Sequence, residues 1–312
     1  MPVFGPIPSR RLGLSLGINN IPPKHCSYSC VYCQIGRTSA MTAERRYFYP
    51  PAGLVVEAGR KLDSLAASGV KPDYLTFVPD GEPTLDINLG MELGLLKKHG
   101  IKLAVISNSS LIHLPEVRRE LSLADWVSLK VDSVDEKAWR VADRPHGALK
   151  LADILAGVEA FARDYKGRFV TETMLVKGLN DDPVGLARTA AFLAGVKPAA
   201  AYILTPTRPP AESGVERATE DMLAAAWNIF TAAGLKAEIV AGYEGNAFPG
   251  TGKPVEELLG TCSVHPMRED AAEEFLRRAG EPPDTLAGLV EKGLLARTSF
   301  GGSVFYIRRP GK

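Results

Sequence analysis

Short runs of β-branched and aromatic residues alternate along the chain with longer stretches whose apolar residues recur at helical spacing. The short runs predict strands at residues 74–78, 102–106, 126–131, 169–175, 201–204 and 236–240. Helical patterns fall between them, for example at residues 53–67, 86–99, 149–165, 183–193 and 220–233. Strand–helix alternation is typical of a parallel sheet built from βαβ units. Six such units, with a cysteine-rich loop before the second strand, predict an α/β fold with a partial barrel rather than a doubly wound sheet.

Two aspartates precede helical patterns and are expected to cap them. They are Asp86 and Asp182, and Pro183 follows the second at the first helical position. The pattern then changes after about residue 242. Residues 242–260 are rich in glycine and proline, which predicts a long loop.

The last fifty residues differ from the rest in their predicted order of elements. Helical patterns at residues 268–279 and 285–292 precede two short strands at 294–299 and 303–307, joined by Phe300-Gly301-Gly302. Two helices followed by a hairpin predict a small winged-helix-like module. We therefore expect a barrel domain over residues 1–241, a linker or active-site loop over 242–262 and this module over 263–312.

The overall charge gives little indication of a partner. The chain has 312 residues, with 37 Lys and Arg against 36 Asp and Glu, so no field of one sign attracts nucleic acid or a membrane. The N-terminus lacks the apolar run of a signal peptide, and no later stretch is long and apolar enough to span a bilayer. We expect a cytoplasmic protein with no membrane partner.

Three of the four cysteines, Cys26, Cys30 and Cys33, lie within eight positions, an arrangement that suggests a metal site rather than a disulfide framework. Three thiolates can hold three irons of a cubane cluster and leave the fourth iron open to a second ligand. The alternative is structural zinc, which needs a fourth ligand such as Cys262 or His25. The spacing favours the cluster, because zinc modules usually pair their ligands two and two.

The motif CxxxCxxC, with the aromatic Tyr32 before the last cysteine, resembles the signature of the radical S-adenosylmethionine (SAM) superfamily. The resemblance implies a 4Fe–4S cluster and SAM as cofactors, with Cys26, Cys30 and Cys33 as metal ligands. It also implies a reductant such as flavodoxin or ferredoxin, and hydrogen abstraction from a substrate by the radical formed from SAM. Segments that resemble further motifs of the family follow in the same order along this chain. The resemblance implies cofactor contacts by Tyr32, Asp80, Gly81, Glu82, Ser107, Asn108 and Glu172.

Residues 8–13, 242–246 and 263–268 narrow the resemblance to a group of radical SAM proteins related to demethylwyosine synthases, which modify tRNA. By position, Lys177 matches a lysine of that family proposed to form a Schiff base with pyruvate. A solvated loop lysine is the competing interpretation. Demethylwyosine synthases carry extra cysteines upstream, and this sequence has none before Cys26. The resemblance therefore predicts the superfamily's chemistry rather than the wyosine reaction.

Arg10 and Arg11 precede the cysteine motif and are candidates for binding a substrate or the SAM carboxylate, because a guanidinium suits bidentate recognition of such groups. His265 and Arg268 are expected either to anchor the C-terminal module or to cap its first helix. Three functions remain open: a radical SAM enzyme acting on tRNA or another large substrate, a radical SAM enzyme that modifies a protein or activates a glycyl-radical enzyme, and a non-enzymatic metal-dependent binding protein.

Overall fold

The main architectural feature is a curled sheet of eight strands in the order β1-β2-β5-β6-β7-β8-β9-β10. The structure is a computed structural model, and it describes residues 2–242, 245–246, 248–250 and 252–308. Strand β1 runs antiparallel to β2, and every other neighbouring pair is parallel. Among the described residues β1 does not pair with β10, so the barrel is partial. The strands are β1 (Val3–Ser9), β2 (Gly13–Ile18), β5 (Tyr74–Phe77), β6 (Lys102–Ser107), β7 (Trp126–Lys130), β8 (Arg168–Met174), β9 (Ala201–Leu204) and β10 (Ala237–Val240).

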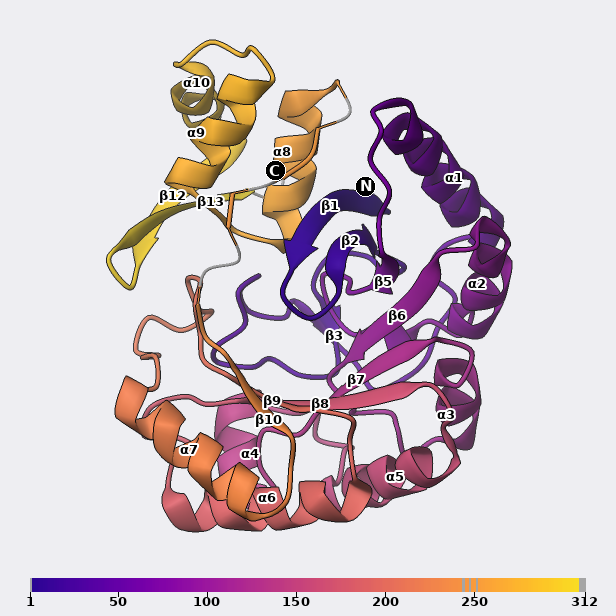
Figure 1. The fold of residues 1–312 in the computed structure, drawn as a ribbon, viewed down its shortest axis with the longest axis vertical. Coiled ribbons are helices and arrows are strands. Elements are labelled where there is room, and N and C mark those ends of the chain that lie inside the picture. The colour runs from indigo at the N-terminus through magenta and orange to yellow at the C-terminus, as the bar shows by residue number, and fades with distance from the viewer. Residues whose placement is uncertain (1, 243–244, 247, 251, 309–312) are drawn as a thin grey trace.

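Helices cover the outer face of this sheet, as Figure 1 shows. They are α1 (Pro51–Ala67), α2 (Leu89–Leu96), α3 (Pro115–Leu121), α4 (Glu136–Asp143), α5 (Leu151–Asp164), α6 (Pro183–Val196) and α7 (Glu220–Ala232), with the short 3-10 helices η1 (Pro83–Leu85) and η2 (Lys97–His99). Alternate residues of each strand point outward and join the helices in the main core, for example Leu103, Val105, Val127 and Leu129. The residues between them point inward.

The inward-facing residues change in character along the strands. Closer to the amino ends of the strands, an apolar cluster contains Ala104, Trp126, Val170 and Tyr202. Closer to the carboxyl ends the inward positions carry Ser128, Lys130 and Glu172, which belong to the same alternating series. The barrel therefore has an apolar floor and a polar upper end.

All six predicted strands are present, which confirms the α/β partial barrel. The prediction missed β1 and β2, so the cysteine loop follows the first parallel strand and precedes the second. The Asp86 cap was wrong, because α2 begins after Asn88 and the Asp86 side chain accepts a hydrogen bond from the Asn88 N–H at 2.9 Å instead. The Asp182 cap was correct, because its side chain accepts from the Gly185 N–H at 2.7 Å.

The C-terminal elements lie beside β1 and the N-terminus (Figure 1), where α8 packs against β1. In chain order they are α8 (Pro254–Val264), β11 (Met267–Arg268), α9 (Glu269–Arg278), α10 (Thr285–Glu291), β12 (Leu295–Phe300) and β13 (Ser303–Arg308), with a small sheet ordered β11-β13-β12. The long loop expected over 242–260 was wrong from Pro254 onward, where α8 begins. Residues 243, 244, 247 and 251 of that stretch lie outside the described residues. The hairpin turn was correct: Gly301 and Gly302 both adopt positive φ, as a two-residue turn requires.

In the part of the chain that the structure describes, no helix combines the length and the apolar character needed to traverse a bilayer.

Candidate functional site

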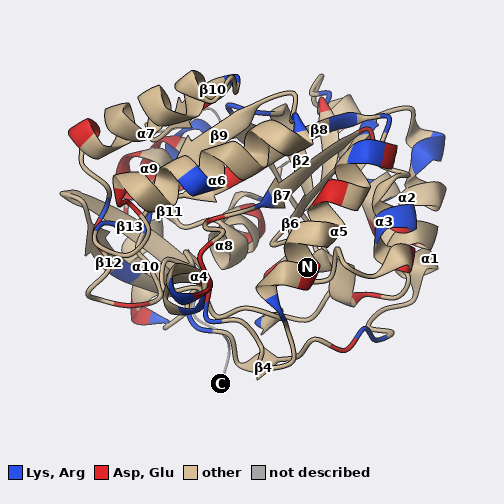
Figure 2. Cartoon of the chain, turned by 90° about the horizontal axis from the view of Figure 1, so that it is seen from below, with Lys and Arg blue, Asp and Glu red and all other residues tan. Residues whose placement is uncertain are grey.

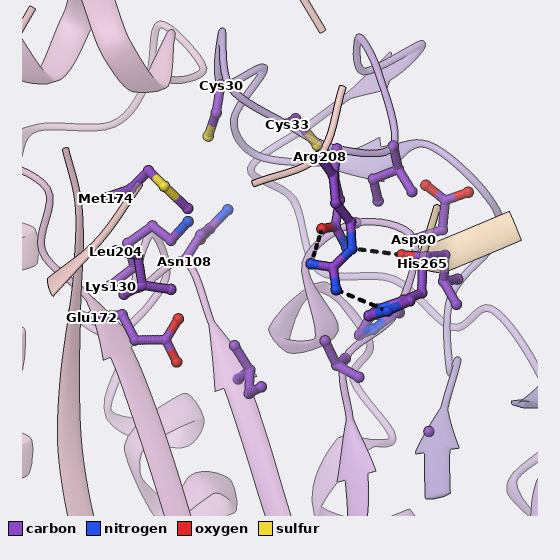
Figure 3. Close-up of a pocket in the computed structure, with 18 of the residues that line it drawn as sticks. Cys30, Cys33, Asp80, Asn108, Lys130, Glu172, Met174, Leu204, Arg208 and His265 are labelled. Carbon is purple, nitrogen blue, oxygen red and sulfur yellow. Dashed lines mark hydrogen bonds between the residues drawn. The ribbon is translucent and has the colours of Figure 1, made fainter. Parts of the chain in front are cut away.

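A cavity of about 330 Å³ lies at the carboxyl ends of the parallel strands, on the inner side of the sheet. Active sites of barrel-type α/β enzymes occupy this end. Figure 3 shows Cys30, Cys33, Asn108, Lys130 and Glu172 around it, contributed by the cysteine loop and three neighbouring strands. The sequence predicted thirteen residues as cluster ligands, cofactor contacts or catalytic and substrate-binding groups, and twelve of them line this cavity: Arg10, Arg11, Cys26, Cys30, Tyr32, Cys33, Asp80, Gly81, Glu82, Ser107, Asn108 and Glu172.

The three cysteines are free thiols held by a compact loop. Cys26 ends the short strand β3 (His25–Cys26), which pairs with β4 (Ala40–Met41). Backbone turns fix the others, with the Cys33 N–H donating to the Cys30 carbonyl at 3.1 Å. Burial, followed by the charge of Glu82, raises the pKa of the Cys26 thiol to about 12, and burial also raises the pKa of Cys30 and of Cys33. Thiolates at this site therefore require compensating positive charge.

Neither candidate for a fourth zinc ligand reaches the cavity. Cys262 is fully buried on α8, in the separate C-terminal core with Phe248 and Met267. The His25 ring packs edge-on against Phe48 and lines another, more open pocket with Met41 and His146. The donor set at the cavity is thus three thiols without either proposed fourth ligand, which fits a cluster with one open iron better than tetrahedral zinc.

Gly81 lets the next segment approach the cysteine loop closely. It has φ of +152°, and a Cβ at this position would lie 1.7 Å from the His25 carbonyl oxygen. Gly81 and His25 also form a parallel bridge between the two segments. Asp80 beside it forms an ion pair with Lys24 at 3.6 Å. Only glycine at position 81 permits the close approach to the His25 carbonyl, because any side chain there would push the cysteine loop away.

Glu82 ties two strand ends together and is fully occupied by protein partners. Its Oε1 accepts hydrogen bonds from the Thr84 N–H, the Thr84 hydroxyl and the Ser107 hydroxyl, at 2.6 to 3.1 Å. Its Oε2 accepts from the Asn108 N–H at 2.7 Å. The side chain is 1% exposed. These contacts make the carboxylate a brace that positions the cavity wall.

Asn108 links this brace to the cysteine loop. Its Nδ2 donates to the Ser27 hydroxyl at 3.0 Å and lies 3.5 Å from the Cys26 sulfur, while Oδ1 accepts from the Ser110 N–H at 2.9 Å. The residue therefore adjoins a prospective metal ligand and also lines the cavity.

Glu172 forms a buried ion pair with Arg11 and accepts a hydrogen bond from the Ser128 hydroxyl at 2.7 Å. Burial alone would raise the pKa of Glu172, but the charge of Arg11, with help from Ser128 and Lys130, holds it below its ordinary value. The pair joins the turn between β1 and β2 to the inner face of β8. Arg10 lies on the same turn, near Gly242.

A compact group of charges lies under the cysteine loop. The Tyr32 hydroxyl contacts Asp132 and donates to Asp143 at 2.6 Å, and the Lys130 ammonium lies 4.7 Å from the centre of the Tyr32 ring. Burial and the charge of Asp132 raise the pKa of Asp143 well above its ordinary value. Burial would lower the pKa of Lys130, but Asp132, Cys30, Asp143 and Glu172 together raise it. These neighbouring charges favour the ammonium form of Lys130.

Lys177 is the one of these thirteen residues that the structure does not bring to the cavity. Its Nζ forms an ion pair with Glu216 at 2.6 Å, and 43% of the side chain is exposed. That pairing raises its pKa, opposite to what an imine-forming lysine needs.

The cavity contains residues that the sequence analysis left out of the site. Lys130, like Glu172, is a polar inward-facing residue near the carboxyl end of a strand. A search of the sequence for such residues would have identified Lys130. Lys24 pairs with Asp80, and Arg208 hydrogen-bonds Gln34 at 3.4 Å and His265 at 2.9 Å. His265 lies at the end of α8, so the C-terminal elements contribute to the cavity wall. No sequence signal marks Arg208 or Gln34.

A partial barrel with three free thiols at the mouth of its cavity is typical of enzymes that hold an iron–sulfur cluster at that position. Residues 20–190 match the Radical SAM superfamily, and the chain belongs to that superfamily. A UPF0026 protein of Methanocaldococcus jannaschii is 43% identical over 98% of this chain and 95% of its own length.

Solved structures share the fold at low identity. TYW1 with a lysine–pyruvate adduct bound matches with a TM-score of 0.53 at 16% identity, covering 70% of this chain and 73% of that one. A radical SAM methyltransferase from Sphaerobacter thermophilus matches with a TM-score of 0.56 at 12% identity, over 77% and 68% of the two chains. SuiB of Streptococcus suis bound to a precursor peptide matches with a TM-score of 0.52 at 12% identity, over 72% and 48%.

Proposed function

We propose that this enzyme holds a 4Fe–4S cluster on Cys26, Cys30 and Cys33, with SAM on the open iron, and abstracts hydrogen from a large substrate. The observation that supports this proposal is that one cavity is lined by three free thiols and by the Glu82–Asn108 and Arg11–Glu172 pairs. When bound, the cluster supplies the electron that cleaves SAM. Flavodoxin or ferredoxin is the reductant that this chemistry calls for.

The chain's own residues hold and shield the cofactors in this proposal. Glu82 fixes the Asn108 backbone, and Asn108 orients the loop that carries Cys26. Arg11 and Glu172 form another part of the cavity wall, where we assign Glu172 to the sugar hydroxyls of SAM and Arg10 to a carboxylate. The apolar floor beneath excludes water from the reacting centre, which protects a reactive species from quenching.

The size of the cavity supports a large substrate. A volume of about 330 Å³ is at the lower end of the range for sites that hold one ligand of ordinary size. With SAM inside the cavity, the space that remains accepts one chemical group of a substrate whose other parts stay outside the cavity. The elements after α8, in the order strand, helix, helix and hairpin, support a winged-helix-like recognition module over residues 263–312, which follows the linker over 242–262 and a barrel over 1–241.

Charge favours a polypeptide over tRNA as that substrate. Nucleic-acid recognition depends on clustered Lys and Arg. Helix α10, Thr285–Glu291, contains neither, and α9 begins with the acidic Glu269 and Asp270. In the cartoon of Figure 2 blue and red segments are interspersed along the helices and loops. The peptide complex of SuiB, on a similar fold, agrees with this preference.

Deuterium transfer tests both the reaction and the substrate class. Total protein and total tRNA from cells grown in heavy water are transferred to ordinary water, so that only carbon-bound deuterium remains. Each is then added to the anaerobically reconstituted, reduced enzyme with SAM. We expect 5′-deoxyadenosine that is one mass unit heavier with the protein fraction. Label from tRNA alone would overturn the polypeptide assignment, and no 5′-deoxyadenosine under any condition would overturn the proposed enzyme.

A further inference from the structure

We propose that Lys130 sets the reduction potential of the cluster, by holding a positive charge beside its ligands that favours the reduced form. This rests on the proposed function above, since it concerns the same cluster. It assigns a role to Lys130, which neither the cysteine motif nor the resemblance identified.

The position of Lys130 carries the proposal. It ends β7 and lines the same cavity as Cys26, Cys30 and Cys33 (Figure 3). Its Nζ lies 4.7 Å from the centre of the Tyr32 ring and 3.4 Å from the Tyr32 hydroxyl. Tyr32 stands between Cys30 and Cys33 in the chain, so the ring fixes the ammonium directly beneath the loop that bears two ligands. A cation over an aromatic face is electrostatically favoured there.

The surroundings keep this ammonium charged and in place. The Asp132 side chain contacts the Tyr32 hydroxyl and accepts a hydrogen bond from the Met174 N–H at 2.8 Å, which fixes its position near Lys130. Glu172 is compensated separately by Arg11.

Reduction of the cluster adds one electron from the external donor and one negative charge, with no bond made or broken in the protein. A fixed cation in a site of low dielectric stabilises that extra charge, and the net charge near a cluster is one of the properties that set its potential. Removing Lys130 also leaves Asp132 uncompensated, which acts in the same direction. The prediction is a lower midpoint potential without Lys130.

The test uses the full chain with its cluster reconstituted anaerobically, in the absence of SAM. Midpoint potentials are measured by electron paramagnetic resonance during redox titration of wild type, Lys130→Gln, Lys130→Met and Lys130→Arg. Lys137→Gln, an exposed lysine on the following helix, is the matched control. We expect Gln and Met to disfavour reduction about tenfold, a shift of roughly 60 mV to lower potential, while Arg and the control stay close to wild type.

Two further measurements separate the possible failures. Iron content of each variant shows whether the cluster assembles, and a wild type without a cluster would defeat the proposed function itself. Equilibrium binding of SAM to the oxidised cluster is measured in parallel. An unchanged midpoint in both neutral variants, with intact clusters, overturns the role of Lys130 in setting the potential. If SAM affinity alone falls in those variants, Lys130 is a SAM-binding residue instead.

Discussion

The Asn108 N–H donates to Oε2 of Glu82 at 2.7 Å, which joins the carboxyl ends of β5 and β6 at the cavity wall. The two residues are 26 positions apart in the chain. Because the other carboxylate oxygen is taken by Thr84 and Ser107, Glu82 serves the site through the backbone that it positions.

Glu82→Gln tests this brace. A glutamine amide places an N–H group where the protein offers donors, so at least one of the buried hydrogen bonds is lost. Hydrogen bonds to charged groups contribute about 1.5–3 kcal/mol, and we expect the free energy of unfolding to fall by about that amount. SAM affinity should fall as well, while iron content is unchanged. Urea denaturation and equilibrium SAM binding measure the two effects, with the exposed Glu159→Gln as control. Equal stability of Glu82→Gln and wild type would contradict the brace.

The three-thiol site predicts a specific pattern of iron loss. Changing Cys26, Cys30 or Cys33 to Ala should abolish the cluster, which holds about four iron and four sulfide per chain in wild type. Cys262→Ala should retain it, because that thiol is buried in the C-terminal core. Iron and sulfide analysis after anaerobic reconstitution measures both. Stoichiometric zinc in place of iron, or iron loss in Cys262→Ala, would disprove the assignment.

The exposed ion pair of Lys177 predicts that it takes no part in catalysis. Lys177→Arg keeps the charge opposite Glu216 and cannot form an imine, so SAM cleavage should continue at the wild-type rate. Borohydride reduction of wild type with pyruvate should add no mass to Lys177. Peptide mass spectrometry detects such an adduct directly, and finding one would restore the wyosine-type reaction that the sequence resemblance suggested.

Glu92, which is fully buried on α2, predicts a dependence of stability on pH. Burial, followed by the charge of Asp86, raises its pKa from 4.5 to about 8. Between these values the folded protein binds a proton that the unfolded chain releases. Stability therefore declines as pH rises through this window, by up to about 1.4 kcal/mol per pH unit.

Glu92→Gln cannot ionise and should lack this component, so it should gain stability relative to wild type as pH rises from 5 to 8. Denaturant midpoints at several pH values measure the difference. Parallel curves for the two proteins would show that Glu92 is ionised in the folded state.

The strand prediction succeeded wherever the hydrophobic runs were continuous and failed where glycine interrupted them. Strand β2 contains Gly13 and Gly17, which weaken the pattern, although Gly17 is required: a Cβ there would lie 2.2 Å from the Phe4 ring. Likewise, glycine and proline before Pro254 predicted a loop and concealed α8. At Gly17 a close tertiary approach selects a residue that local patterns associate with loops.

The sequence by itself indicated the three thiols of the proposed cluster site, because Cys26, Cys30 and Cys33 lie within eight residues and any fold keeps them together. It also determined the parallel barrel, since hydrophobic periodicity is a local property of each segment. Only the tertiary structure decided that Lys130 reaches the cavity and Lys177 does not, because that depends on which face of a strand or loop points inward. It also paired Glu172 with Arg11, which is 161 positions away. Such a partner is chosen by how the strands pack together, and the residues adjacent to Glu172 in the chain do not specify it.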